Sequence, residues 1–144
     1  MFEQQVAYAP DAVALRFGDQ QLSYAQLNAR ANRLAHWLTA QGAAPEQLVG
    51  IALTRSFEMI ASLLAVLKSG AAYLPLDPDY PPRRLEAMLQ DAKPLLVLST
   101  HDTGLAASSA APFFYLDQAS VAAALAAQPD DYRLAERAAR HAQH

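Results

Sequence analysis

Cysteine is absent from the 144-residue sequence. Without it the chain has no disulfide bond, thiolate zinc site or cysteine nucleophile, and the absence fits a reducing compartment. Long apolar runs are also missing, since no stretch approaches the roughly 18 to 20 residues that a membrane span needs. The first residues carry no basic region and no long apolar stretch, so they do not resemble a secretory signal. We therefore expect a cytoplasmic protein with no membrane partner.

Glycine is scarce, and its spacing is uninformative for nucleotide binding. The glycines are Gly18, Gly42, Gly50, Gly70 and Gly104. No two of them have the G-x-G spacing of a dinucleotide fold, and no G-x-x-x-x-G-K-[ST] loop occurs. Backbone amides cannot converge on a phosphate without such a loop. No serine lies in a G-x-S-x-G nucleophile elbow either. We expect no phosphate cradle in this chain.

Positive charge is in the minority, with 11 Lys and Arg against 14 Asp and Glu, and the net charge is −3. The basic residues are scattered, so no basic stripe predicts a nucleic-acid partner. Apolar residues make up 53% and charged residues 17%. These proportions are typical of a packed globular protein, and the length predicts one domain without an internal boundary.

The first third of the chain predicts a hairpin and a long helix. Val13, Leu15 and Phe17 alternate with smaller or polar residues, and a returning strand follows the turn at 18–20. Ser23 and Gln26 have the spacing of a capping box, which predicts a helix start. The helix should bury Leu27, Ala31, Leu34 and Leu38, should end near Gly42, and should expose Asn28, Arg30, Asn32, Arg33 and His36.

From residue 48 onward the pattern alternates between strand and helix. Strands are predicted at 48–53, 72–76, 95–98 and 113–116, with a polar loop over 99–112. One helix should run from Ser56 to Gly70 through Met59, Ile60, Leu63, Leu64 and Leu67, and another should begin at Pro82 and end before Lys93. We expect short helices at 2–8 and 119–127 and no strand after 128. The order indicates a three-layer α/β fold with a mostly parallel sheet, in which Pro75 lies at a strand end or an edge.

A few residues are candidates for metal binding. Asp77 and Asp79, with Asp91 further along, could be magnesium ligands, but beside three prolines they are more typical of turn initiation. His141 and His144 are i, i+3 neighbours with no third ligand, which favours a frayed end. We predict no metal site.

Other candidates have simpler structural interpretations. Lys68 lies near a helix C-terminus, where the dipole favours a cation, and a catalytic role is the weaker hypothesis. His36 is expected on the solvated helix face, and Tyr73 and Tyr80 in core or loop packing. The residues alone give no catalytic constellation.

Two motifs carry a family resemblance. The segment LSYAQL (22–27) resembles L-[ST]-Y-x-E-L, the first core motif of nonribosomal peptide synthetase adenylation domains, with Gln26 in place of glutamate. The segment LKSGAAYLPLD (67–77) resembles the second, with Ser69 in place of alanine. Asp79 to Pro81, Arg83 and Leu85 extend the match, and the similarity covers about residues 2–135.

The resemblance implies a function for the parent enzyme. Such domains activate an amino acid with ATP and magnesium as an aminoacyl-adenylate, then load it onto a phosphopantetheine carrier. It also implies that residues 1–144 are the N-terminal portion of one domain, ending before the phosphate loop. No position here matches the substrate pocket, the adenine-binding aromatic, the ribose-binding aspartate or the catalytic lysine, so we assign no catalytic, cofactor-binding or metal residue.

The implied partners are the remainder of the adenylation domain and neighbouring condensation and carrier domains. The leading hypothesis is an inactive scaffold segment. One alternative is a binding module that complements a separately encoded C-terminal half. Another is a fragment of an acyl-CoA synthetase or luciferase relative, although AAYLPLDPDYP (71–81) favours the peptide synthetase branch.

Overall fold

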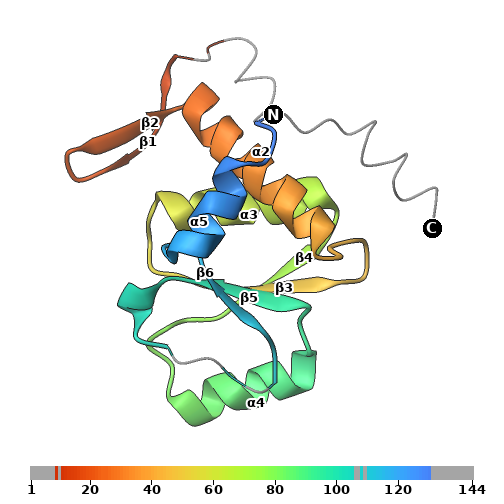
Figure 1. Cartoon of the computed structure of the whole chain (residues 1–144). Helices are drawn as coiled ribbons and strands as arrows, with labels where there is room; N and C mark the ends of the chain where they lie inside the picture. The colour runs from red at the N-terminus through yellow and green to blue at the C-terminus, as the bar shows by residue number, and fades with distance from the viewer. Residues whose placement is uncertain (1–8, 10, 106–107, 109, 131–144) are drawn as a thin grey trace.

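The computed structural model describes residues 9, 11–105, 108 and 110–130. A four-stranded parallel sheet has helices on both faces, and a separate two-stranded hairpin lies at one end of the molecule (Figure 1). The predicted α/β fold with a mostly parallel sheet and a small N-terminal hairpin is confirmed. The helix predicted at 2–8 and the tail after 130 lie outside the described residues. No helix in the described ranges has the length and apolar character to cross a membrane.

The hairpin leads directly into the longest helix. Strands β1 (Val13–Phe17) and β2 (Gln20–Ser23) pair antiparallel, and α2 (Tyr24–Ala40) follows. The Gln26 backbone amide donates to Ser23 Oγ at 3.1 Å, and the Ser23 amide donates to Gln26 Oε1 at 2.9 Å. The predicted capping box is confirmed, and it satisfies two amides that the first helical turn leaves without partners.

The parallel sheet has the strand order β4-β3-β5-β6. Its strands are β3 (Leu48–Ala52), β4 (Ala72–Pro75), β5 (Leu96–Ser99) and β6 (Phe113–Tyr115). Helices α3 (Phe57–Ser69) and α4 (Pro82–Ala92) connect β3 to β4 and β4 to β5, and α5 (Ala119–Ala126) follows β6. Pro75 ends β4, an edge strand, as predicted, so its missing amide removes no internal ladder bond.

Alternate residues of the central strands pack into two separate hydrophobic cores, one on each face of the sheet. On one face Val49 and Leu98 pack with α2 and α3, the layer that also holds α5 (Figure 1). On the other face Val97 packs with Leu85 and Leu89 of α4. This period of two follows from the pleat of a strand, and it makes β3 and β5 buried on both sides, as their unbroken apolar sequence predicted.

The polar face of α2 is solvated only in part. Arg30 is exposed as predicted and Asn28 and Arg33 are half-buried, but His36 is 8% exposed and Asn32 only 3% exposed. The Asn32 side-chain amide donates to the Asp130 carbonyl at 2.8 Å, so the chain that leaves α5 passes over this residue. Asn32 is therefore covered by a segment far away in sequence.

The apolar face of α3 also differs from the prediction. Ala61, Ala65 and Val66 are buried, whereas Leu67 is 56% exposed. The helix is apolar nearly all round, so periodicity did not identify its inner face. The small alanines lie where α3 packs against α2, its most extensive helix contact.

Replacing Ser23 with alanine should lower the free energy of unfolding by about 1 kcal/mol, because the Gln26 amide in the first turn of α2 loses its partner. Urea denaturation of the 144-residue chain measures this change. Ser120→Ala, at an exposed position in α5, is the matched control and should stay within about 0.5 kcal/mol of the parent. Equal losses in both variants would contradict the role of the capping box.

Gly50→Ala should destabilise the fold by about 1 to 3 kcal/mol through overpacking. A Cβ at this position would lie 2.9 Å from Val97 Cγ2 and 3.1 Å from Leu76 Cδ1. Combining it with Val97→Ala removes the nearer atom, so the double variant should lose less stability than the sum of the single losses. If the stability losses of the two single variants are strictly additive in thermal or urea unfolding, the contact with Val97 is not what excludes a side chain at residue 50.

Candidate functional site

The first place to seek a ligand site is the point where the sheet changes direction. The chain moves from β3 outward to β4, then returns across β3 to β5, with α3 and α4 on opposite faces. The connections after β3 and β5 therefore diverge at the carboxyl ends of these strands. In open α/β sheets this divergence usually opens the ligand-binding crevice.

Here the crevice is closed by side chains of the chain itself. Ser99 is fully buried, and its Oγ donates to the Ala52 carbonyl at 2.9 Å. The same oxygen lies 3.0 Å from Thr103 Oγ1, which in turn donates to the Thr100 carbonyl at 2.9 Å. Both hydroxyl groups are engaged in bonds that join β3, β5 and the following turn, so they hold the crevice shut.

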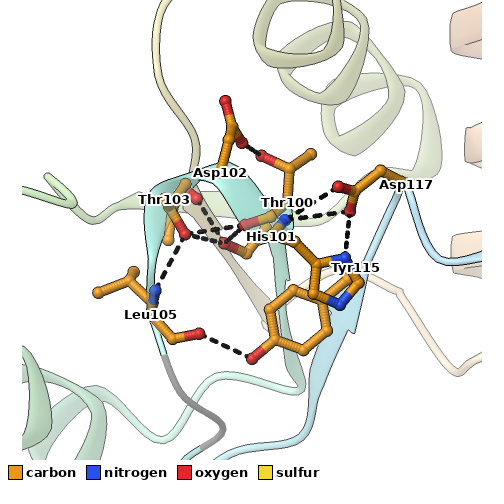
Figure 2. A network of polar contacts seen from close by, with 9 residues as sticks. Thr100, His101, Asp102, Thr103, Leu105, Tyr115 and Asp117 are labelled. Carbon is orange, nitrogen blue, oxygen red and sulfur yellow. Dashed lines mark hydrogen bonds and ion pairs between the residues drawn. The ribbon is translucent and has the colours of Figure 1, made fainter.

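A wider polar network continues from this point to the end of β6 (Figure 2). The His101 backbone amide lies 3.1 Å from both carboxylate oxygens of Asp117, and His101 Nδ1 lies 3.0 Å from Asp117 Oδ1. The imidazole stacks on Tyr115 with a 4.5 Å centroid separation, and the Tyr115 hydroxyl donates to the Leu105 carbonyl at 2.9 Å. The loop predicted over 99–112 therefore begins with a 3₁₀ turn, His101–Thr103, held by these contacts.

The network contains a serine, a histidine and an aspartate, but they do not form a catalytic triad. A triad needs the serine hydroxyl hydrogen-bonded to the imidazole. Ser99 instead donates to a main-chain carbonyl, and no hydrogen bond between Ser99 and His101 occurs in the described part of the chain. His101 and Asp117 belong to no recognisable sequence motif. The only signal was the polar cluster Thr100 to Thr103 directly after an apolar strand.

A cavity of about 340 Å³ lies on the α4 side of the sheet. Leu76, Leu85 and Phe113 are among its lining residues, and Ser108 Oγ donates to Glu86 Oε2 at 2.6 Å beside them. The polar groups at the rim are paired with each other. The cavity is an apolar hollow, and its described lining residues contain no converging set of reactive groups.

The aspartates considered as metal ligands serve a turn instead. Asp77 Oδ1 accepts a hydrogen bond from the Asp79 backbone amide at 2.9 Å. This is the turn-initiating role that the sequence favoured. Asp91 lies on α4, and the described residues contain no cluster of three His, Cys, Asp or Glu side chains able to hold a metal ion. His141 and His144 lie outside the described residues.

The remaining candidates divide into confirmed and corrected predictions. Lys68 lies in the last turn of α3 as predicted, and it is 8% exposed. Tyr80 has the Arg84 guanidinium 4.0 Å above its ring, which is loop packing as expected. Tyr73 is 43% exposed on the edge strand β4, so the prediction of core or loop packing is wrong there. A two-sided apolar pattern does not reveal that an edge strand lacks a covering layer.

The starts of α2 and α3 and the glycine of β3 offer no group that we can assign to ATP. The N-terminus of α2 is capped by its own side chains, and that of α3 is capped by Ser56. Gly50, at the centre of β3, is enclosed by Val97 and Leu76 and exposes no amide nest. We therefore assign no step of nucleotide chemistry to these residues.

Comparison with known proteins identifies the family. A family model described as AMP-binding enzyme matches residues 2–143. The chain belongs to this family. A dimodular nonribosomal peptide synthase of Bacillus subtilis (strain 168) is 57% identical over 98 residues, which cover 68% of this chain and 4% of that protein. The probable non-canonical nonribosomal peptide synthetase CymA of Salinispora arenicola is 45% identical over 130 residues, which cover 90% of this chain and 2% of that protein.

A solved structure agrees with the sequence relatives. A crystal structure of the nonribosomal peptide synthetase FmoA3 in an AMPPNP-bound form superposes with a TM-score of 0.81 at 26% identity. The match covers 91% of this chain and 14% of that one. The predicted similarity to an N-terminal segment of a peptide synthetase adenylation domain is confirmed, and the chain spans only a small share of the relatives it matches.

Ser99→Ala should lower the free energy of unfolding by about 1 to 3 kcal/mol, because the buried Ala52 carbonyl loses the hydroxyl that bonds to it. Chemical denaturation measures the loss. Ser120→Ala, which removes a hydroxyl at an exposed position in α5, is the matched control and should change stability by less than about 0.5 kcal/mol. If the two variants are equally stable, the Ser99 bond does not hold the crevice closed.

Proposed function

We propose that residues 1–144 are the N-terminal scaffold of a single adenylation domain whose parent synthetase activates an amino acid with ATP and magnesium. The aminoacyl-adenylate would then be passed to a phosphopantetheine thiol on a carrier domain. The observation that carries the proposal is the AMP-binding match over residues 2–143. The absence of cysteine supports a cytoplasmic location for the parent.

The contribution of this chain to that reaction is structural. The first motif starts α2 through Ser23 and Gln26, and the second ends α3 at Gly70, whose φ of 87° is the left-handed conformation that glycine adopts readily. The second motif then forms β4 and turns the chain at Asp77. Because the crevice at the switch point is closed by Ser99, nucleotide and amino acid are held by residues beyond this segment.

A second candidate function is complementation by a separately encoded C-terminal half. Leu67 is 56% exposed on α3, and Tyr73 is 43% exposed on β4. Strand β4 is the edge of the sheet, so its outer backbone groups are available for pairing with another chain. Exposed apolar side chains beside an open edge are features that a partner segment would cover. The condensation and carrier domains of the synthetase are the further partners of either arrangement.

Amino-acid-dependent ATP–pyrophosphate exchange distinguishes these functions. For the scaffold function we expect no exchange by the 144-residue chain with ATP, magnesium and each proteinogenic amino acid, because its described residues offer no nucleotide site. Calorimetric titration with ATP and magnesium should show no saturable heat. Robust exchange by the chain alone would overturn the proposal.

The control is the same chain mixed with a separately expressed remainder of the adenylation domain. Recovery of exchange on mixing supports complementation in addition to the scaffold role. Absence of exchange at every ratio, with both parts folded by circular dichroism, would exclude complementation and leave the scaffold role.

A further inference from the structure

A groove of about 450 Å³ separates the hairpin from the start of α3. One wall carries Phe17 of β1, and the other carries Arg55 and Phe57 at the entrance to α3. Arg30 of α2 reaches the same groove. None of these residues belongs to the closed crevice at the carboxyl ends of β3 and β5, so the groove is a separate feature of the surface.

The two phenylalanines that line the groove form an aromatic pair, and a guanidinium group lies over each ring. Phe17 and Phe57 meet edge to face with centroids 5.0 Å apart and an interplanar angle of 77°. The Arg55 Cζ lies 5.9 Å from the Phe17 centroid, and the Arg30 Cζ lies 5.9 Å from the Phe57 centroid. An arginine held over a ring keeps its planar fork of N–H donors at the edge, where a carboxylate binds bidentately.

These cations are only partly neutralised by the chain. Arg55 is exposed, and no carboxylate of the described residues lies within ion-pair distance of it. Arg30 Nη1 lies 3.7 Å from Glu58 Oε1, but the two side chains are 46% and 45% exposed. A pair this exposed contributes little free energy, so an incoming carboxylate can compete for Arg30 while binding Arg55 directly.

Neutral polar and acidic side chains also line the groove. Gln20, Gln21 and Glu58 are among its lining residues, and Gln21 Oε1 accepts a hydrogen bond from Arg16 Nη2 at 3.3 Å. The Ser56 hydroxyl is used in capping α3, since it accepts from the Met59 amide at 3.2 Å and donates to the Thr54 carbonyl at 2.9 Å. Because Glu58 faces Arg30, the Arg55 fork beside the aromatic pair is the part of the groove that is complementary to a negative charge flanked by apolar groups.

We propose that this groove is a docking surface for an extended acidic peptide segment, with a carboxylate on Arg55 and apolar neighbours on Phe17 and Phe57. An inorganic anion would fill only a small part of 450 Å³ and would leave the rings uncovered. In the described part of the chain the hairpin sheet contains only β1 and β2, so its outer backbone groups have no strand partner. Such edges bind extended peptides through main-chain hydrogen bonds.

The test is an NMR titration of the ¹⁵N-labelled 144-residue chain with the N-acetylated, C-amidated peptide Val-Glu-Val-Asp-Val. We expect saturable shifts at the amides of Arg55 and Phe57. Arg55→Gln should weaken binding about tenfold, because a charge-assisted hydrogen bond is lost. Arg83→Gln, at an exposed position on α4, is the matched control and should bind like the parent.

Three results would overturn the proposal. The first is equal binding of the uncharged analogue Val-Gln-Val-Asn-Val, and the second is an absence of saturable shifts at the groove. The third is inorganic phosphate producing the same shifts with the same affinity, which would make the groove a simple anion site. If Arg55→Gln is unfolded, as judged by the loss of its dispersed spectrum, Arg55→Lys provides the test. Lysine keeps the charge but lacks the planar fork of N–H donors, so binding should still weaken. Unchanged binding would contradict the bidentate contact.

Discussion

The bare backbone of Gly50 is the point at which the two cores of the fold depend on each other. It lies in β3, with Val97 and Leu76 so close that a Cβ would meet them at 2.9 and 3.1 Å. Because these two side chains belong to the core beneath α4, the missing side chain lets that core close against the sheet. Val49 and Ile51, on either side of Gly50, fill the core beneath α2 and α3. One small residue therefore allows a single strand to contribute to both cores.

The parts of the fold that could be predicted from the sequence are those decided within a few residues. The capping box spans Ser23 to Gln26, and the left-handed end of α3 needs only Gly70. The burial of Asn32 could not be predicted, because its side chain bonds to a carbonyl 98 residues further along the chain. The inner face of α3 could not be predicted either. Leu67 and its apolar neighbours are all hydrophobic enough to be buried, and only the packing against α2 determines which of them face inward.

The same distinction between local and distant contacts applies to the candidate site. Glycine spacing is local, so the prediction that this chain has no phosphate loop rests on the sequence alone. The closure of the crevice depends on Ser99 meeting Ala52, which is 47 residues away and reaches it only through the pairing of β3 with β5. His101 and Asp117 are 16 residues apart and meet because β5 and β6 end at the same edge. Contacts of this kind have no motif, since parallel pairing brings together residues from unrelated parts of the sequence.

The departures from the family motifs show what those motifs preserve. Gln26 replaces a glutamate, yet its side-chain oxygen still accepts the Ser23 amide, so the capping geometry survives without the charge. Ser69 replaces an alanine at a fully buried position, and its hydroxyl donates to the Val66 carbonyl at 2.7 Å. A buried hydroxyl is tolerated where the helix itself supplies an acceptor. Both substitutions keep the backbone conformation and change the side-chain chemistry, which is the pattern expected of residues that shape a scaffold rather than contact a substrate.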